Sequence, residues 1–197
     1  MSEMAFDALA ELEDDALLVL YANGDASAAR LLTARLGPRV FAHARRMVGD
    51  AAEAEDIAQE AMLRLWRIAP EWRQGEAKVT TWLYRVTANL CTDRLRRRRG
   101  GHTGLDAAAE PADDAPGPAE AMQERARMDA LQSALDALPD RQRQAVVLRH
   151  IEGLANPEIA AIMEIGVEAV ESLTARGKRA LAAALAGRRE ELGYVED

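Results

Sequence analysis

A run of arginines is the clearest chemical feature of the sequence. Residues 94–99 read RLRRRR, so that five of six consecutive side chains carry a guanidinium group. Guanidinium groups match phosphate oxygens in shape and charge, and each phosphate that they neutralise releases bound counterions. Cations are also favoured at the C-terminus of a helix, but five arginines are more than such an end requires. The run therefore indicates contact with a nucleic acid.

Aromatic and polar side chains precede this run. Ring faces stack on unpaired bases, and an asparagine can read a base edge. The alternative is that the aromatic residues are half-buried core residues, and on periodicity alone this alternative is favoured. The side chains of this group are Trp82, Tyr84, Arg85, Asn89 and Asp93.

A polar and partly acidic face is predicted on a helix that begins at Asp50 and ends at Pro70. Its members recur at spacings of three and four, which places them on one side of a helix. Charged groups mixed with large apolar ones suit a protein–protein interface. An ordinary amphipathic helix with a solvated acidic face is the simpler alternative, and from the pattern alone it is preferred. The face consists of Asp56, Gln59, Glu60, Leu63 and Trp66.

The C-terminal part has the pattern of a helix-turn-helix. A short helix follows Asn156-Pro157, Gly166 turns the chain, and a longer, basic helix comes next. Basic and hydroxyl side chains on this helix can contact phosphates and base edges. The alternative is a small helical module that binds another protein. The candidate DNA-binding residues are Glu171, Ser172, Thr174, Arg176, Lys178 and Arg179.

No arrangement of residues indicates catalysis, a metal site or another cofactor. His43, His102 and His150 are scattered and have no carboxylate or cysteine arranged around them. The single cysteine, Cys91, excludes an internal disulfide and a cysteine-based zinc site. It lies among apolar neighbours, so we expect a small buried residue rather than a nucleophile. We therefore expect no catalytic residue, no cofactor and no enzymatic activity.

The elements that must position these groups are predicted to be helices throughout. Hydrophobic residues make up 49% of the chain and aromatic residues only 4%, so that Ala, Leu, Val and Ile must build the cores. Asp25 and Asp50 are predicted to cap two helices. Gly37-Pro38 is predicted to interrupt the helix between them, because proline removes a main-chain hydrogen bond. The sequence predicts an all-α fold.

A flexible acidic linker is predicted to divide the chain into two small helical domains, at residues 1–99 and 120–197. Residues 100–119 are rich in Gly, Pro, Asp and Ala and cannot bury enough apolar surface to offset their ordering entropy. The net charge of -8 is unevenly spread, since residues 82–104 carry six basic and one acidic side chains. The local field decides phosphate binding, so this basic segment outweighs the overall charge.

The sequence shows no sign of membrane insertion or export. No stretch approaches the roughly 18 consecutive apolar residues of a membrane span. The first residues, MSEMAFDALAELEDD, lack the basic start of a signal peptide. We therefore expect a cytoplasmic protein.

Two stretches of the sequence resemble the extracytoplasmic-function (ECF) sigma factors of the sigma-70 family. DAAEAEDIAQEAMLRLWR, then a loop, then TTWLYRVTANLCTDRLRRRR, resembles their second region. LDALPDRQRQAVVLRHIEGLANPEIAAIMEIGVEAVESLTARGKRAL resembles their fourth region. The resemblance covers roughly residues 12–100 and 124–186, in the family's order. It implies a factor that binds core RNA polymerase and directs promoter recognition and DNA melting, in a stress or envelope response.

The resemblance also implies a role for each group of residues. The face around Gln59 would grip the clamp coiled coil of the polymerase. The loop of residues 73–78 and the helix after it would melt and read the minus-ten element, with Asn89 near a flipped base. The final helix would read the minus-thirty-five element, the acidic linker would thread the RNA exit path, and an anti-sigma factor is the typical further partner. The implied minus-ten residues are Arg73, Lys78, Trp82, Arg85, Asn89, Asp93, Arg94, Arg96, Arg97 and Arg98.

The final helix departs from the family pattern at both ends. Glu168-Ala169 stands where a hydroxyl residue and a small neighbour are usual, and TARGKR replaces the usual arginine-rich end. Gly177 in this end costs roughly 1 kcal/mol of helix propensity relative to alanine.

Two other functions fit parts of the pattern. A sigma-like protein that sequesters an anti-sigma factor without contacting DNA would be expected to lack the basic run and the Trp82 face, and both are intact. A stand-alone helix-turn-helix regulator would need a dimer interface, for which the sequence gives no signal. The sequence therefore favours a sigma factor over both alternatives.

Overall fold

The computed structural model describes residues 9–75, 77–100 and 118–186. All regular elements in these ranges are helices, which confirms the predicted all-α class. Of the predicted linker, residues 101–117 lie outside the described residues. The helices are α2 (Asp14–Ala22), α3 (Ala26–Val48), α4 (Ala51–Ile68), the 3-10 turn η1 (Ala69–Glu71), α5 (Val79–Gly100), α6 (Pro118–Asp136), α7 (Asp140–Val146), the π-helical turn η2 (Val147–Ile151), α8 (Asn156–Met163) and α9 (Val167–Ala186).

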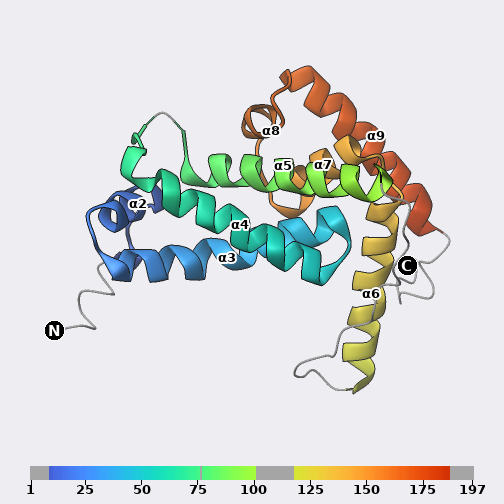
Figure 1. Ribbon diagram of the computed structural model, residues 1–197. Coiled ribbons are helices and arrows are strands. Elements are labelled where there is room, and N and C mark those ends of the chain that lie inside the picture. The colour runs from blue at the N-terminus through green and yellow to red at the C-terminus, as the bar shows by residue number, and fades with distance from the viewer. Residues whose placement is uncertain (1–8, 76, 101–117, 187–197) are drawn as a thin grey trace.

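Helices α2–α5 form a first bundle around an aliphatic core (Figure 1). Leu17, Leu32, Leu65 and Leu83 contribute one fully or almost fully buried side chain from each of its four helices. The two predicted caps are confirmed. Asp25 accepts a hydrogen bond from the main-chain N–H of Ser27, and Asp50 does the same for Glu53, both at 2.8 Å.

The predicted break at Gly37-Pro38 is wrong, because α3 runs through both residues without interruption. Pro38 is exposed, as is Ala34, whose carbonyl would have accepted the missing hydrogen bond. Solvent can therefore hydrate that carbonyl. Burial of Leu36 and Val40 on the opposite face holds both halves of the helix against the same core. Tertiary packing thus overrides the local cost of the proline.

Helices α6–α9 form a second bundle, which contains the predicted helix-turn-helix as α8 and α9. The buried Gly177 explains one departure from the family pattern. A Cβ built on it would lie 2.6 Å from Cγ2 of Val146 and 3.1 Å from the carbonyl oxygen of Gln142. The missing side chain therefore lets α9 pack closely on α7, which offsets the loss of helix propensity.

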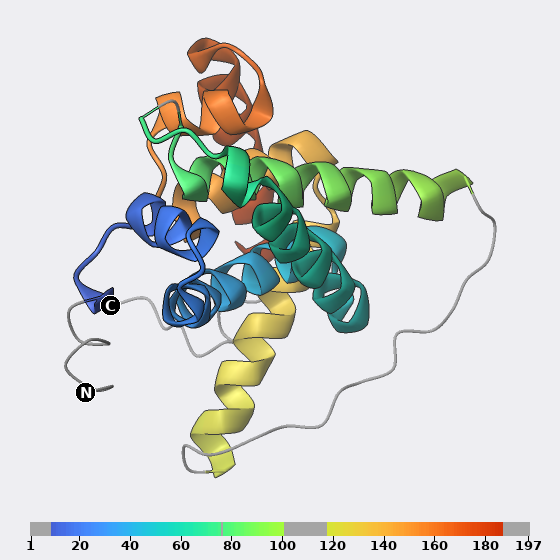
Figure 2. The same ribbon diagram turned by 60° about the vertical axis from the view of Figure 1, so that its left-hand side comes forward.

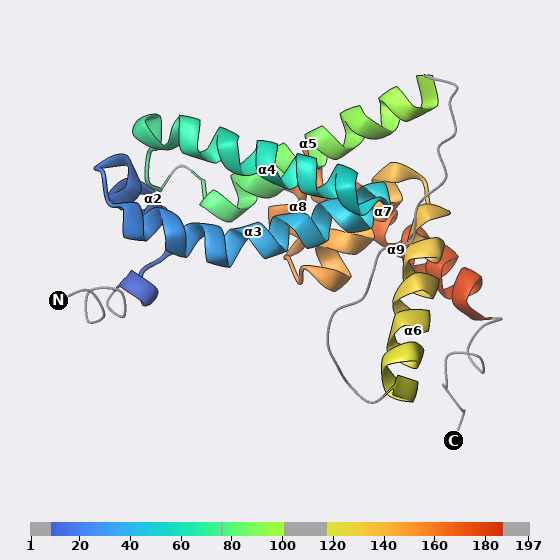
Figure 3. The ribbon, with the colours of Figure 1, turned by 60° about the horizontal axis from the view of Figure 1, so that its bottom comes forward.

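The two bundles pack directly against each other. Helix α8 contacts α5, and α6 and α7 contact α3. Figures 2 and 3 show the second bundle against the first. Arg143 of α7 is 5% exposed and donates a hydrogen bond to the main-chain carbonyl of Met47 at the end of α3. The second bundle therefore covers one side of the helix that carries the arginine run.

Candidate nucleic-acid interface

The arginines at the end of α5 differ in what they contact. Nε of Arg94 lies 3.0 Å from Oε1 of Glu53, and Nη1 of Arg98 lies 3.5 Å from Oε2 of the same residue. Arg98 also donates a hydrogen bond of 3.0 Å to the carbonyl of Val48. Because the start of α4 engages them, Arg94 and Arg98 are less available to an external phosphate than the sequence suggested.

Arg96 and Arg97 are both exposed and lie between the two arginines that Glu53 engages. Nη1 of Arg96 lies 3.5 Å from the exposed carboxylate of Asp93, one helical turn away. Among the described residues, no ion pair is formed by Arg97. Exposed pairs of this kind are weak and are readily exchanged for others. This pair of arginines is thus the part of the run best placed to contact phosphates.

Carboxylates of α8 and of the residue that caps its end form ion pairs at the start of α5. Nζ of Lys78 lies 3.2 Å from Oε1 of Glu158, and Nη1 of Arg85 lies 3.5 Å from Oε1 of Glu164. The main-chain N–H of Ala155, followed by the Lys78 ammonium, lowers the pKa of Glu158 below its ordinary value. Glu158 is therefore a carboxylate at neutral pH, and two of the predicted minus-ten residues are bound within the protein.

The carboxylates of the second bundle were not predicted as part of this site. Arg99 has a further such partner, since its Nη2 lies 2.6 Å from Oδ1 of Asp140. Lys78, Arg85 and Arg99 are seven and fourteen residues apart, a spacing that keeps them on one side of a helix. That spacing was visible in the sequence. The identity of the acidic partners was not, because it depends on how the two bundles pack.

Tyr84 joins the two bundles at the middle of this surface. It is 5% exposed and belongs to an apolar cluster with residues of the second bundle, and its hydroxyl donates a 2.6 Å hydrogen bond to Glu152. Burial, and then that carboxylate, raise the pKa of Tyr84 well above its ordinary value. The prediction that Tyr84 is a core aromatic is confirmed. The core to which it belongs includes residues of the second bundle.

His43 lies beneath Tyr84, with ring centroids 5.2 Å apart in an edge-on arrangement. It is fully buried, and burial, followed by the charge of Arg46, lowers its pKa to about 4. Nδ1 of His43 lies 4.0 Å from Oε1 of Glu152, but at neutral pH the imidazole is uncharged, so this approach is not an ion pair. Within the described ranges, neither ring nitrogen has a hydrogen-bond partner.

The remaining predicted minus-ten residues lie around this covered surface. Trp82 is half-buried and meets Trp72 edge-on, with ring centroids 6.3 Å apart. Asn89 is exposed on α5, and Arg73 is exposed in the loop between η1 and α5. Trp82, Asn89 and Arg73 thus contribute an aromatic ring, an amide and a guanidinium from α5 and the loop before it.

The predicted protein-binding face lies on the outside of α4. Leu63 is 48% exposed, and the Asp56 side chain is 75% exposed. Gln59 donates a 3.4 Å hydrogen bond to Glu55, and Glu60 accepts one of 2.8 Å from Arg64. These contacts stay within α4. Trp66 is separate from them, since it is half-buried and lies against Tyr21 of α2, with ring centroids 4.7 Å apart.

Helix α9 presents most of the predicted minus-thirty-five residues to solvent. Thr174 differs from the others, because its hydroxyl oxygen is buried and has no hydrogen-bond partner among the residues that the structure describes. Glu171 accepts a hydrogen bond of 3.4 Å from Asn156 of α8, which ties the two helices together. The exposed residues are Glu171, Ser172, Arg176, Lys178 and Arg179.

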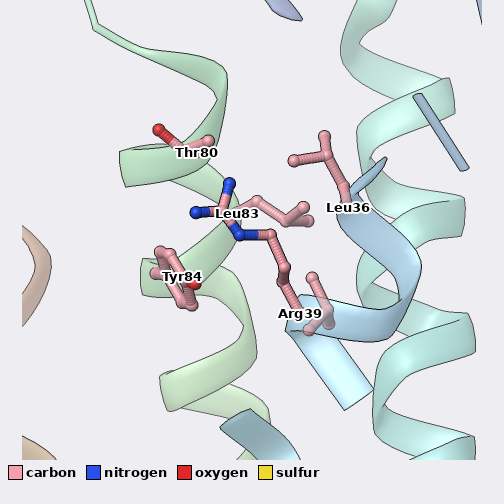
Figure 4. Close-up of a pocket in the computed structure, with 6 residues that line it drawn as sticks. Leu36, Arg39, Thr80, Leu83 and Tyr84 are labelled. Atoms are coloured by element: carbon pink, nitrogen blue, oxygen red, sulfur yellow. The ribbon is translucent and has the colours of Figure 1, made fainter. Parts of the chain in front are cut away.

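A small pocket lies between α3 and α5 beside Tyr84. It is lined by Leu36, Arg39, Val40, Thr80, Leu83 and Tyr84, and Figure 4 shows Arg39 extending from α3 towards α5. Its lining is mostly apolar and holds no pair of acidic and basic groups suited to proton transfer.

Cys91, elsewhere on α5, is fully buried, which raises the pKa of its thiol to about 12.

Two further kinds of feature are absent from the described part of the chain. Within residues 9–75, 77–100 and 118–186, no group of three or more His, Cys, Asp or Glu side chains could hold a metal ion. In the same ranges, no helix is long and apolar enough to cross a membrane.

Comparison with known proteins identifies two family regions. Residues 32–100 match the family described as Sigma-70 region 2, and residues 128–181 match Sigma-70, region 4. RNA polymerase sigma-H factor of Pseudomonas aeruginosa is 31% identical over 186 residues, which cover 90% of this chain and 96% of that protein. ECF RNA polymerase sigma factor SigW of Bacillus subtilis is 32% identical over 152 residues, which cover 73% and 81%.

A third relative is longer than this chain. ECF RNA polymerase sigma factor SigE of Mycolicibacterium smegmatis is 39% identical over 149 residues, and the match spans only 56% of its length. Among solved structures, CnrH in complex with the cytosolic domain of CnrY has a TM-score of 0.67 at 26% identity, covering 88% of this chain and 97% of that chain. The sigma factor RpoE of Bartonella quintana, at 20% identity and a TM-score of 0.63, shares the fold.

Proposed function

The chain belongs to the extracytoplasmic-function sigma factors of the sigma-70 family, and from this premise we propose that it binds core RNA polymerase and directs promoter recognition and DNA melting. The observation that carries the proposal is the presence of both family regions on one chain, in order, each with exposed residues suited to its role. The family consists of transcription factors rather than enzymes, and we propose no catalytic activity and no cofactor for this chain. Because core polymerase is cytoplasmic, we propose the same location for the protein.

The α4 face is proposed to bind the polymerase. Asp56, Gln59 and Leu63 are exposed side by side on successive turns, with Glu60 beside them. An exposed leucine among groups that hydrogen bond is typical of the centre of a protein interface. The half-buried Trp66 of the same helix packs on Tyr21.

The α5 surface is proposed to melt and read the minus-ten element. Trp82 offers a ring for an unpaired base, and the exposed Asn89 offers an amide for a base edge. Arg96 and Arg97 contribute phosphate contacts that do not depend on sequence. The other proposed contacts on this surface are Arg73, Lys78, Arg85, Asp93, Arg94 and Arg98.

Helix α9 is proposed to enter the major groove at the minus-thirty-five element, as the second helix of a helix-turn-helix does. Its exposed Arg176, Lys178 and Arg179 match the phosphates that flank the groove. The division of the chain into residues 1–99, a flexible linker at 100–119, and 120–197 is part of this proposal. It allows the two DNA-reading bundles to reach two separated promoter elements.

An anti-sigma factor is the proposed regulatory partner. The similar protein CnrH was solved in complex with the cytosolic domain of CnrY. A surface with exposed apolar and charged residues, such as the α4 face with Leu63, suits such a partner as well as it suits polymerase.

Run-off transcription with purified core polymerase on a genomic promoter library tests the proposed function. We expect the full chain to direct initiation from a small set of promoters that share minus-ten and minus-thirty-five elements. The chain with Asn89→Ala should select a broader set, whereas Thr33→Ala, an exposed change on α3, should select the same set. If core polymerase gains no promoter preference from the chain, the proposed function is wrong.

A further inference from the structure

The first turn of α5 is capped by a residue of another helix. Val79 is the first residue of α5, and its main-chain N–H is one of the donors at a helix start that find no acceptor within the helix. Lys78 precedes it and carries an ammonium group, which donates hydrogen bonds but accepts none. Oδ1 of Asp15 on α2 accepts a hydrogen bond of 2.9 Å from the Val79 N–H. The acceptor that the local sequence lacks is thus supplied by a residue 64 positions earlier.

Helix α2 holds Asp15 in a fixed place. Leu17 and Leu18, which follow Asp15 on α2, are fully buried in the core of the first bundle. The same helix contacts η1, which precedes the loop before α5, and α5 itself. Figure 1 shows α2 at the same end of the first bundle as this loop. The hydrogen bond of Asp15 therefore joins a well-packed part of the core to the point where the loop ends and α5 begins.

Trp82 belongs to the turn that Asp15 caps. Its main-chain N–H donates to the carbonyl of Lys78 at 3.1 Å, which closes the first turn of α5. Its half-buried ring lies edge-on to that of Trp72, at the other end of the loop, and both rings pack against the core of the first bundle. A helix start that loses its cap is less stable and frays. Loss of the cap would therefore loosen the turn that sets the direction of the Trp82 ring.

We propose that Asp15 is a positioning residue for minus-ten recognition, which holds the first turn of α5, and thereby the Trp82 ring, through its hydrogen bond to Val79. The inference rests on the proposed function, because it requires Trp82 to meet an unpaired base. A group that binds a ligand must be held close to its productive geometry by the residues around it. In this role Asp15 acts on DNA only through α5 and is not itself required to touch a base or a phosphate.

The experiment compares three single variants of the full chain in complex with core polymerase. Asp15→Ala removes the acceptor, whereas Asp15→Asn keeps an acceptor oxygen and removes only the charge. The matched control is Asp25→Ala, which removes the cap of α3, where Asp25 accepts a hydrogen bond of 2.8 Å from the N–H of Ser27. Both alanine variants therefore lose a helix cap in the first bundle. Equal circular dichroism spectra and saturating concentrations of each variant ensure that folded complexes are compared.

The first readout is base preference, measured as the ratio of open-complex yields on the preferred minus-ten sequence and on its single-base variants. Loss of a helix cap shifts a local equilibrium about fivefold, so we expect Asp15→Ala to lower this ratio by up to about fivefold. Asp15→Asn and Asp25→Ala should keep the wild-type ratio. A residue that acts only through stability would lower the yield on every sequence alike and leave the ratio unchanged.

The second readout is hydrogen exchange of the Val79 amide in the free chain, followed by NMR. An amide exchanges faster when its local structure opens more often, and we expect an increase of about fivefold for Asp15→Ala. Asp25→Ala should leave this rate unchanged. Because no DNA is involved, this measurement tests the cap separately from recognition. An unchanged rate for Asp15→Ala would mean that the hydrogen bond does not hold the start of α5, and the proposal would be wrong.

Three results of the first readout would also overturn the proposal. Unchanged base preference for Asp15→Ala would show that the cap does not position the reading groups. An equal loss for Asp15→Ala and Asp25→Ala would show that any lost cap has this effect. An equal loss for Asp15→Ala and Asp15→Asn would show that the charge, rather than the hydrogen bond, is responsible. The wild-type chain in the same assay separates these results from a failure of the proposed function, which would leave the wild type without any base preference.

Discussion

The guanidinium group of Arg143 on α7 donates a hydrogen bond to the main-chain carbonyl of Met47, the penultimate residue of α3. The same side chain donates to the carbonyl of Asp136 at 2.8 Å and lies 3.3 Å from its carboxylate. A buried cation thus satisfies the free carbonyl end of one helix from the other bundle.

Replacing Arg143 by Leu should therefore destabilise the chain and loosen the contact between bundles. The carbonyls of Met47 and Leu138 lose their charged donor in a buried setting, which we expect to cost about 2–3 kcal/mol of the free energy of unfolding. Urea denaturation measures this change, with the exposed Arg125→Leu as control. Equal midpoints for the two variants would show that the buried hydrogen bonds contribute nothing.

The same substitution, glycine to alanine, should have opposite effects in two helices. At Gly177 a Cβ would meet Val146 at 2.6 Å, so we expect a loss of about 1–3 kcal/mol from overpacking. At Gly37, within α3, a Cβ would meet nothing within 4 Å, so we expect a gain of about 0.4–1 kcal/mol. Thermal unfolding of both variants checks the signs, and a stabilised Gly177→Ala would contradict the close packing of α9 on α7.

The arginines that Glu53 engages and those that it does not engage should differ in DNA binding. Arg96→Ala with Arg97→Ala should weaken open-complex formation on all promoters and lower the salt slope by about 1 for each phosphate that is no longer neutralised. Arg94→Ala with Arg98→Ala should change the slope less, because Glu53 already engages both side chains.

Asn89→Ala tests base reading on the same helix. It should leave the salt slope unchanged and relax preference at one minus-ten position by roughly 1–3 kcal/mol. The measurement is open-complex yield on a set of minus-ten variants at several salt concentrations. The opposite result is that the arginine changes alter base preference while Asn89→Ala lowers open-complex yield equally on every promoter. It would mean that the arginines read bases and that Asn89 does not.

The α4 face is tested by Gln59→Ala together with Glu60→Ala. Both side chains hydrogen bond to neighbours on α4 itself, so helical content should be unchanged while affinity for core polymerase falls. Co-purification with core polymerase measures the decrease. The exposed Arg30→Ala on α3 is the control, and core binding equal to that control would remove the α4 face from the interface.

The buried His43 makes stability depend on pH. Its pKa is lowered from 6.5 to about 4 in the folded state, so the unfolded chain binds a proton more readily. The contribution of the uncharged His43 to the free energy of unfolding is therefore fully present above about pH 6.5. It is lost as the pH drops towards 4, by up to about 3 kcal/mol. Urea midpoints between pH 7 and pH 4 should decline less steeply for His43→Leu. Parallel curves would show that another group causes the acid sensitivity.

Local features of the fold were predictable from the sequence. Asp25 and Asp50 cap helices as expected, because a cap depends on residues two or three positions away. The proline rule failed at Pro38, since burial of the flanking turns against the first-bundle core outweighs one missing hydrogen bond. Local rules thus located helix starts but misjudged a helix that tertiary packing holds together.

Only part of the candidate site was predictable, because local rules do not show how the bundles pack. Exposed residues such as Gln59, Asn89 and Arg97 lie where helical spacing put them. The partner of Lys78 is Glu158, 80 residues further along the chain, and no spacing rule connects them. Pairs at such separations depend on how the bundles pack, which one sequence alone does not reveal.

The burial of Cys91 has a consequence for how the protein can respond to oxidants. With a thiol pKa of about 12, almost no thiolate is present at neutral pH, and the sulfur is fully buried. Peroxides and nitrosating agents attack the thiolate, so Cys91 is a poor target for both. Since it is the chain's single cysteine, this chain has no thiol-based redox sensor of its own. Any oxidative signal that reaches it through thiol chemistry must be received by a partner.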